Sequence, residues 1–212
     1  MYETHPSLEL NAQFRHRPFQ GVAPPEAMFL FIGLDANYDP DLENSPSFHS
    51  VLEYHRDGVA FWRRRGVHHP FLLPEYRGDG RRYHRTFARI GFTPKDAHLV
   101  SFAELLHIPT VGRSSLTPQD LDPLHLRWLN EAILHGQAKY IFVSAGVARL
   151  MRASKAFPWL PKKPDTSRPL RILYGDPTRT VYSHLHFSNY GKFQKQLEEE
   201  ANSIAALLPT SI

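Results

Sequence analysis

The chain has 212 residues, of which 42% are apolar and 12% aromatic, proportions typical of one globular domain and not of a disordered chain. It contains no cysteine, which excludes structural disulfides, cysteine nucleophiles, thiolate zinc sites and iron–sulfur clusters. The formal net charge is only +4, but residues 56–89 contain nine arginines and three acidic residues. This concentration is typical of a surface that binds a polyanion such as DNA, although a merely solvated surface has the same composition.

No apolar run reaches the roughly 18 residues that a transmembrane helix needs, so no membrane-spanning segment is predicted. The first residues, with Glu3, His5 and Glu9, also lack the apolar region of a secretion signal. We therefore expect a soluble, cytoplasmic protein with no membrane partner, and we expect it to be a monomer.

Four apolar, β-rich regions occur along the chain, and each is a continuous run, as expected of strands buried on both faces of a parallel sheet. They comprise residues 28–34, 98–102, 139–145 and, as a pair, 170–174 with 179–184. Apolar residues at helical spacing predict helices at residues 80–91, 120–135 and 190–208. The segments expected to be irregular are residues 35–47, 65–80 and 157–168.

Strands that alternate with helices predict an α/β fold, specifically a doubly wound, mainly parallel four-stranded sheet with helices on both faces. We expect a single domain over residues 1–212 with its core at about 26–208, since no segment resembles an interdomain linker or a repeat. Ligands of such sheets bind at the carboxyl ends of the strands. The residues that follow the first and last strands are therefore the candidates for a site.

The first predicted strand reaches Gly33 and Leu34, and Asp35, Asn37 and Tyr38 follow it. A carboxylate, an amide and a phenol directly after a buried strand predict a loop that faces a ligand. Ordinary turn formation is the alternative interpretation, because Asn, Asp and Pro all favour turns.

The last predicted strand ends in His184, and His186 and Ser188 follow it. Two histidines at i and i+2 of an extended segment point to the same side, which suggests a metal site with Asp35 as the third ligand. The other interpretation places His184 in the core and lets only His186 reach the cleft. We favour the second interpretation and expect neither a bound metal nor a cofactor.

These two segments resemble the two motifs of the uracil-DNA glycosylase superfamily, and their spacing is closest to that of the mismatch-specific uracil/thymine type. Residues 33–36 (GLDA) are similar to its first motif, Gly-x-Asp/Asn-Pro, and residues 186–188 (HFS) to its second, His/Asn-Pro-Ser. Residues 83–93, 105–110 and 143–146 resemble intervening segments of the family. The resemblance therefore covers residues 28–208, nearly the whole chain.

The chain departs from the family at three places. Ala36 and Phe187 stand where the two motifs have proline. The asparagine that reads the base in the family has no clear counterpart, and Phe102 and Glu104 are nearest to its place. These departures bear on the choice of base more than on the fold.

The resemblance implies a site that breaks the N-glycosidic bond between a base and its sugar. Asp35 is expected beneath the sugar, where a carboxylate stabilises the positive charge of the transition state and activates water. His186 is expected to donate a hydrogen bond to the oxyanion that develops on the departing base. Asn37 is expected to hold the water or to read a base edge, and Tyr38 to shape the pocket wall.

A target base must leave the duplex and stack on an aromatic ring. Phe48, Phe61 and Trp62 follow the first motif at the distance where the family has its stacking residue, although in a chain with 14 Phe and 3 Trp the core is the favoured place for each one taken singly. The further candidates for binding substrate or DNA are Ser188, Tyr190, Arg63, Arg64 and Arg65. The tyrosine follows the second motif, where a wedge enters the duplex, and helix packing is its alternative role.

The sequence thus predicts a DNA glycosylase-like hydrolase that removes uracil or another damaged or modified base from single- or double-stranded DNA. Two alternatives stay open. The first is a catalytically inactive protein of the same fold that only binds nucleic acid. It stays open because Ala36 and Phe187 replace the prolines of the two motifs. The second is a metal-dependent hydrolase that uses Asp35, His184 and His186.

Overall fold

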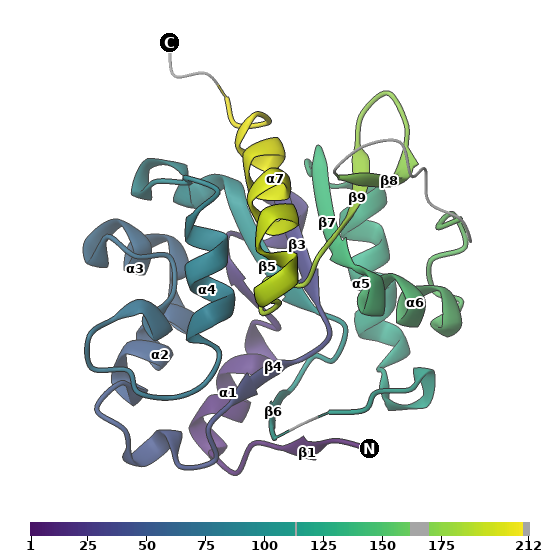
Figure 1. The fold of residues 1–212 in the computed structure, drawn as a ribbon. Helices are drawn as coiled ribbons and strands as arrows, with labels where there is room; N and C mark the ends of the chain where they lie inside the picture. The colour runs from purple at the N-terminus through teal and green to yellow at the C-terminus, as the bar shows by residue number, and fades with distance from the viewer. Residues whose placement is uncertain (113, 162–169, 210–212) are drawn as a thin grey trace.

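The computed structural model describes residues 1–112, 114–161 and 170–209, and Figure 1 shows their arrangement. Its central sheet has six strands in the order β2-β5-β3-β7-β9-β8. In the same order, the bounds of these strands are Phe19–Gly21, Val100–Glu104, Phe29–Gly33, Tyr140–Ser144, Thr180–His184 and Arg171–Gly175. The four inner strands pair in parallel, whereas β2 and β8 are antiparallel strands at the two edges. The structure is α/β with a mainly parallel sheet, as the sequence predicts.

The prediction of a four-stranded sheet is wrong, because the sheet has six strands. Three of the four parallel strands lie within the predicted apolar regions, and β5 overlaps its region, 98–102, but extends two residues beyond it. The last of these regions also contains β8, which forms an antiparallel hairpin with β9. β2 was not predicted, since an edge strand of three residues is too short to show a periodic pattern.

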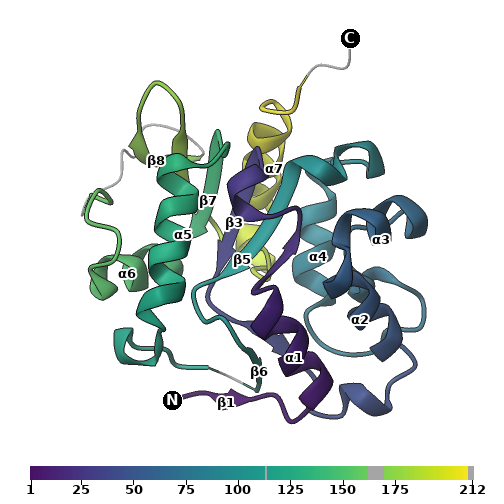
Figure 2. The same ribbon diagram turned by 180° about the vertical axis from the view of Figure 1, so that it is seen from behind.

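Helices cover both faces of the sheet (Figures 1 and 2). One face packs against α5 (Pro123–His135) and α6 (Ala145–Ser154). The other packs against α3 (Gly58–Arg65), α4 (Arg81–Ala88) and α7 (Gln194–Ala205). The remaining helices are α1 (Leu8–His16) and α2 (Phe48–Arg56), which pack on each other. Short 3-10 helices span Pro24–Glu26, Leu42–Asn44, Pro70–Leu72, Pro94–Leu99, Pro118–Asp120 and Gly191–Phe193.

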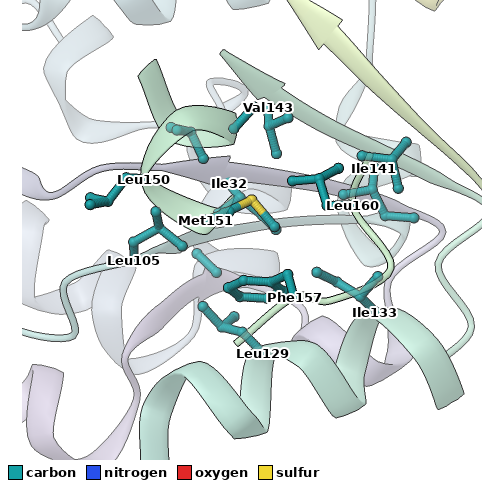
Figure 3. Close-up of a cluster of buried hydrophobic side chains, with 14 of the residues drawn as sticks. Ile32, Leu105, Leu129, Ile133, Ile141, Val143, Leu150, Met151, Phe157 and Leu160 are labelled. Atoms are coloured by element: carbon teal, nitrogen blue, oxygen red, sulfur yellow. The ribbon is translucent and has the colours of Figure 1, made fainter. Parts of the chain in front are cut away.

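The two faces of the sheet differ in chemistry, because successive residues of each strand point to opposite sides. On the first face, here called the aliphatic face, branched side chains pack together, including Ile32, Leu105, Ile141, Val143, Leu129 and Ile133 (Figure 3). On the second, here called the aromatic face, phenylalanines predominate, including Phe29, Phe31, Phe102, Phe142, Phe87 and Phe187. Continuous apolar strands are thus covered on both sides, as their sequences predict.

Local signals explain where α5 begins and ends. Asp122 caps the helix by accepting hydrogen bonds from the backbone N–H groups of Leu124 and His125, at 2.7 and 3.4 Å. Pro123 occupies the first turn, where its missing N–H costs nothing. The helix ends at His135, before Gly136, as predicted. The predicted start at residue 120 is three residues too early, because Asp120 ends the preceding 3-10 helix and Asp122 is the cap.

A second, three-stranded sheet lies beside the carboxyl edge of the central sheet. β4 (Ala36–Tyr38) pairs in parallel with β6 (Pro109–Val111), and β1 (Glu3–Thr4) pairs antiparallel with β6. β4 follows β3 and β6 follows β5. This ladder therefore joins the chain segments that leave two neighbouring strands of the central sheet.

Two of the segments predicted to be irregular contain short regular elements. β4 lies within residues 35–47, and one 3-10 helix lies within residues 65–80. Of the third segment, residues 162–168 lie outside the described residues. Within the described ranges, none of the helices is both long and apolar enough to cross a bilayer.

Candidate active site

A cavity of about 210 Å³ lies at the carboxyl edge of the central sheet, next to α4. Asp35, Glu104 and His186 line it from three different strands, since Asp35 follows β3, Glu104 ends β5 and His186 follows β9. This position agrees with the rule that ligands of parallel α/β sheets bind at the carboxyl ends of the strands. Pockets for drug-sized molecules begin at about 300 Å³, so the cavity suits a small group such as a single base or sugar.

The Asp35 carboxylate is held by hydroxyl groups of the segment that includes β6. Its Oδ2 atom accepts hydrogen bonds from Thr110 Oγ1 at 2.5 Å and Ser114 Oγ at 2.6 Å. Asn37 extends the network, because its amide donates to Thr110 Oγ1 at 3.2 Å and to the Gly112 carbonyl at 2.5 Å. Both donors to Asp35 reach the same oxygen, and no described residue donates to Oδ1.

His186 is solvent-exposed at the cavity and is oriented by its own turn. The backbone N–H of Ser188 donates to His186 Nδ1 at 3.3 Å, and the ring of Tyr83 lies 5.3 Å away between centroids. Partial burial of the imidazole ring lowers the pKa of His186, whereas the negative charge of the nearby Asp35 raises it. Since Nδ1 accepts a hydrogen bond, the proton of the neutral ring resides on Nε2, which is the donor.

Glu104 stands opposite Gly33 in the register between β5 and β3. Its carboxyl group lies directly over the Gly33 backbone, where a Cβ atom at position 33 would overlap both carboxyl oxygens. Burial, and then the negative charge of Asp35, raises the pKa of Glu104 well above its usual value. Its buried Oε2 atom has no hydrogen-bond partner among the described residues. Both effects favour the protonated form of the Glu104 carboxyl group.

Four buried or half-buried histidines pack near the wall of the cavity, namely His55, His68, His69 and His84. The rings of His69 and His84 line the cavity and stack with their centroids 3.5 Å apart at an angle of 7°. His68 Nε2 lies 3.2 Å from His84 Nδ1, and His55 Nε2 lies 2.8 Å from the Tyr38 hydroxyl. Burial lowers the pKa of all four, to about 3 for His55 and His68, so the rings are neutral.

The structure brings together five of the residues that the sequence predicts for a site. The residues in this group that line the cavity are Asp35, Asn37, Tyr38, His186 and Ser188. Tyr38 is almost wholly buried, and its hydroxyl is engaged by His55 and by the Gln20 amide at 3.4 Å. It therefore contributes to the floor of the cavity.

The three aromatic residues predicted to stack on a base do not line the cavity. Phe61 and Trp62 are 0% and 5% exposed, because α3 turns its apolar side into the protein. Phe48 packs on a separate cluster that includes Leu42 and Val51. These positions correct the prediction, since a ring buried in the core has no free face for a base. The aromatic residues that do line the cavity are Phe71, Tyr83 and Phe102, together with Tyr38.

The three consecutive arginines of α3 also lie outside the cavity lining. Arg64 and Arg65 both form ion pairs with Glu53, the second at 2.9 Å, and Arg63 is exposed to solvent. These three candidates for binding DNA are therefore not among the residues that line the cavity. Arginines of α4 are nearer to it: Arg82 lies over the ring of Tyr190 at 4.3 Å, and the next residue in the chain, Tyr83, lines the cavity.

His184 is a packed residue, as the favoured interpretation of the sequence has it. It is 7% exposed, its Nδ1 donates to the Leu185 carbonyl at 2.6 Å, and its ring lies 4.5 Å from that of Phe187. Burial lowers its pKa to about 4. Over the part of the chain that the structure describes, no three His, Asp or Glu side chains are grouped to hold a metal ion.

Sequence reasoning did not single out Thr110, Ser114, or the histidines at positions 69 and 84. Thr110 ends the segment 105–110 and Ser114 lies in a stretch without a motif, and only the fold brings the two hydroxyl groups to Asp35. The histidines had a usable signal, because His-His-Pro-Phe and Tyr-His place imidazoles beside aromatic residues in both segments.

Comparison of the sequence with models of protein families and with curated proteins returns no match. The functional assignment therefore depends on the geometry of the site.

Proposed function

We propose that this protein is a DNA glycosylase with a fold of the uracil-DNA glycosylase type, which hydrolyses the N-glycosidic bond of uracil or of another damaged or modified base. The observation that carries the proposal is that Asp35 and His186 line one small cavity although they are far apart in the sequence. The segments that contain them are the two that resemble the motifs of the family. The reaction needs water and uses neither metal nor cofactor.

Asp35 has the surroundings that the sugar side of such a site requires. Breaking the bond to the base leaves positive charge on the sugar, which a carboxylate beneath it stabilises. Thr110 and Ser114 hold Oδ2 in place, so Oδ1 is left to face the sugar or to orient the attacking water. The carboxylate is thereby positioned before the substrate arrives.

His186 has the protonation state that the base side requires. Its neutral ring carries a proton on Nε2, since Nδ1 accepts from the Ser188 backbone. A neutral donor can stabilise an oxyanion on the departing base without giving up its proton. Phe71, Tyr83 and Phe102 supply aromatic surface around the space where that base would lie.

The DNA partner is supported by the exposed arginines of α4. Arg82 and Arg85 point into solvent on the helix that carries the cavity residues Tyr83 and His84. Exposed Tyr190 lies against Arg82, next to the turn that holds His186. Positive charge and an exposed aromatic ring beside a base-sized cavity suit a DNA strand. Its phosphates would lie along the rim of the cavity while one base enters it.

The test is release of a base from oligonucleotides that each carry one altered base, in single- and double-stranded form, followed by alkali to cleave at abasic sites. We expect cleavage with at least one base. Asp35→Asn should slow release greatly while DNA affinity stays nearly unchanged, because the sugar cation loses its counter-charge. His186→Ala should slow release by about a hundred- to a thousandfold, as loss of an oxyanion donor does elsewhere.

Matched controls are Asp41→Asn and His135→Gln, which change an exposed carboxylate and an exposed imidazole outside the cavity. Neither should alter release. DNA binding without release of any base would support the inactive alternative and overturn the proposal. Release that a chelator abolishes and added zinc restores would support the metal-dependent alternative instead.

A further inference from the structure

Two carboxyl groups line the cavity, and their surroundings differ sharply. Asp35 accepts two hydrogen bonds from hydroxyl groups at one oxygen. Glu104 receives none at its buried Oε2 atom and lies against the bare backbone of Gly33. A carboxyl group held by hydrogen-bond donors, beside one whose buried oxygen has no partner, is an arrangement that can supply both a carboxylate and an acid to one reaction.

We propose that Glu104 is the general acid of the reaction and donates its proton to a ring nitrogen of the departing base while Asp35 stabilises the sugar. The inference rests on the proposed function and narrows its substrate class. A base that needs such an acid is one that leaves poorly as an anion and carries a basic ring nitrogen. Purine-type bases, with their basic N7, fit this description better than uracil, which leaves as an anion stabilised by donors such as His186.

The backbone positions Glu104 for this role. It ends β5 at the point where that strand pairs with the end of β3, two residues before Asp35. Gly33 leaves the space that the carboxyl group occupies, and any side chain at position 33 would displace it. Because Oε2 has no partner among the described residues, the proton of this carboxyl group is not committed to another group of the protein. Glu104 also lines the cavity in which a ligand would lie.

Titratable groups near Glu104 come from several elements that surround it, namely β4, α2, α4, α5 and the segments that follow β3 and β9. Asp35 follows β3, and buried tyrosines on three elements are close enough to interact with its charge: Tyr38 on β4, Tyr54 on α2 and Tyr83 on α4. His69, His84 and His186 line the same cavity, and His125 on α5 lies 2.8 Å from the Glu104 backbone carbonyl. The described residues that line the cavity include no lysine or arginine. No lysine or arginine among these described residues therefore stabilises ionised Glu104.

The reaction starts when the bond between C1′ and the base nitrogen breaks and its electron pair goes to the base. Glu104 gives its proton to a ring nitrogen of the base and becomes a carboxylate. Water then adds to C1′ of the sugar cation and gives a proton to the Asp35 carboxylate, so that an abasic sugar and a neutral base remain. Exchange with solvent returns a proton to Glu104 and removes one from Asp35.

The test compares release of hypoxanthine, 7-methylguanine and uracil from otherwise identical oligonucleotides in single turnover, from about pH 5 to about pH 9. A purine methylated at N7 already carries the positive charge that protonation supplies, so its departure needs no acid. Glu104→Gln preserves the shape of the side chain and removes the proton that can be transferred. Glu131→Gln, an exposed change on α5, is the matched control.

We expect Glu104→Gln to slow hypoxanthine release by about a hundred- to ten-thousandfold, the contribution usual for a general acid. Release of 7-methylguanine should change by less than about tenfold, within what a small perturbation of the site produces. Wild-type release of hypoxanthine should fall as pH rises through the raised pKa of Glu104, and the variant should lack this fall. A residue with a merely structural role would slow both purines alike.

Equal slowing of the two purines, or wild-type protein that releases uracil alone and is unaffected by Glu104→Gln, would overturn the acid role and leave the glycosylase proposal standing. Wild-type protein that releases none of these or other altered bases would overturn the proposed function and this inference together. The failures of the two proposals are thus distinguishable.

Discussion

The same strands build two unlike faces of the central sheet. Against α5 and α6, the aliphatic face packs branched side chains such as Ile32, Ile141 and Leu129. Against α3, α4 and α7, the aromatic face stacks planar rings, among them Phe31 and Phe142 at 4.7 Å and 16°. No residue of α5 or α6 lines the cavity, whereas α4 contributes two and the aromatic face continues into the wall through Phe102.

The helices on the aliphatic face therefore support the sheet, whereas the aromatic face and its helix α4 also contribute to the candidate site. Branched side chains fill space densely but offer no polar groups or flat surfaces to a ligand. Rings offer both, because their faces stack and their histidine and tyrosine members carry hydrogen-bonding atoms. Changes to the two layers should therefore separate stability from chemistry, and three experiments test how far this separation holds.

The largest effect is expected from Leu129→Ala in the aliphatic face. Leu129 is 0% exposed, so its truncation leaves a cavity and should lower the free energy of unfolding by about 2–5 kcal/mol. Base release per folded molecule should not change, because the residue does not line the site. Urea unfolding and single-turnover release measure the two quantities. A fall in release beyond the loss of folded protein would break the proposed separation of the layers.

A smaller effect is expected from acid on the aromatic face. Burial lowers the pKa of His68 to about 3, below the value of about 6.5 in an unfolded chain. Stability from the neutral ring is therefore present above pH 6.5 and is lost as pH falls toward 3, by about 2 kcal/mol for this residue at pH 5. His68→Phe should remove that loss while the exposed control His135→Gln retains it. Identical losses in wild type and His68→Phe would show that His68 does not titrate in this way.

The smallest effect on stability is expected from two double substitutions of arginine, one on α4 and one on α3. Arg82→Gln with Arg85→Gln on α4 should flatten the dependence of log affinity on log salt by about 1.8 units for duplex DNA, or about 1.4 for a single strand, with no change in melting temperature. Arg64→Gln with Arg65→Gln on α3 is the matched control, since both residues pair with Glu53. An equal effect of the two pairs would mean that DNA contacts extend well beyond the cavity rim.

The sequence was sufficient to predict the parallel strands and several of the helices, because burial on both faces leaves a long apolar signature. The runs at 28–34 and 139–145 contain β3 (Phe29–Gly33) and β7 (Tyr140–Ser144) with errors of one residue at each end. Helices α1 and α2 were not predicted, since each has only nine residues and its apolar face is interrupted by polar side chains. Edge strand β2 was missed for the same reason of length.

The site could be predicted only where residues directly follow strands. Asp35 and His186 fall into this class, so the rule for parallel sheets places them together. The donors to Asp35 and the raised pKa of Glu104 depend on contacts between distant segments, which no local pattern encodes. The prediction failed for Phe61 and Trp62, which are buried in the core. The sequence alone does not distinguish an aromatic residue of the core from one that lines a pocket.

The small sheet beside the cavity has a consequence for how tightly a substrate can bind. Asn37 pairs with Thr110 in the ladder of β4 and β6, so backbone hydrogen bonds join the segment that follows Asp35 to the segment that contains its donor Thr110. Loops that become ordered only on binding lose conformational entropy at that moment, and this loss weakens affinity. Here the ordering is complete once the chain has folded, and the N-terminal strand β1 shares in it through its pairing with β6. Under the proposed function, a substrate would meet an Asp35 carboxylate that is already held in place, so its binding energy would not be reduced by the cost of ordering these segments.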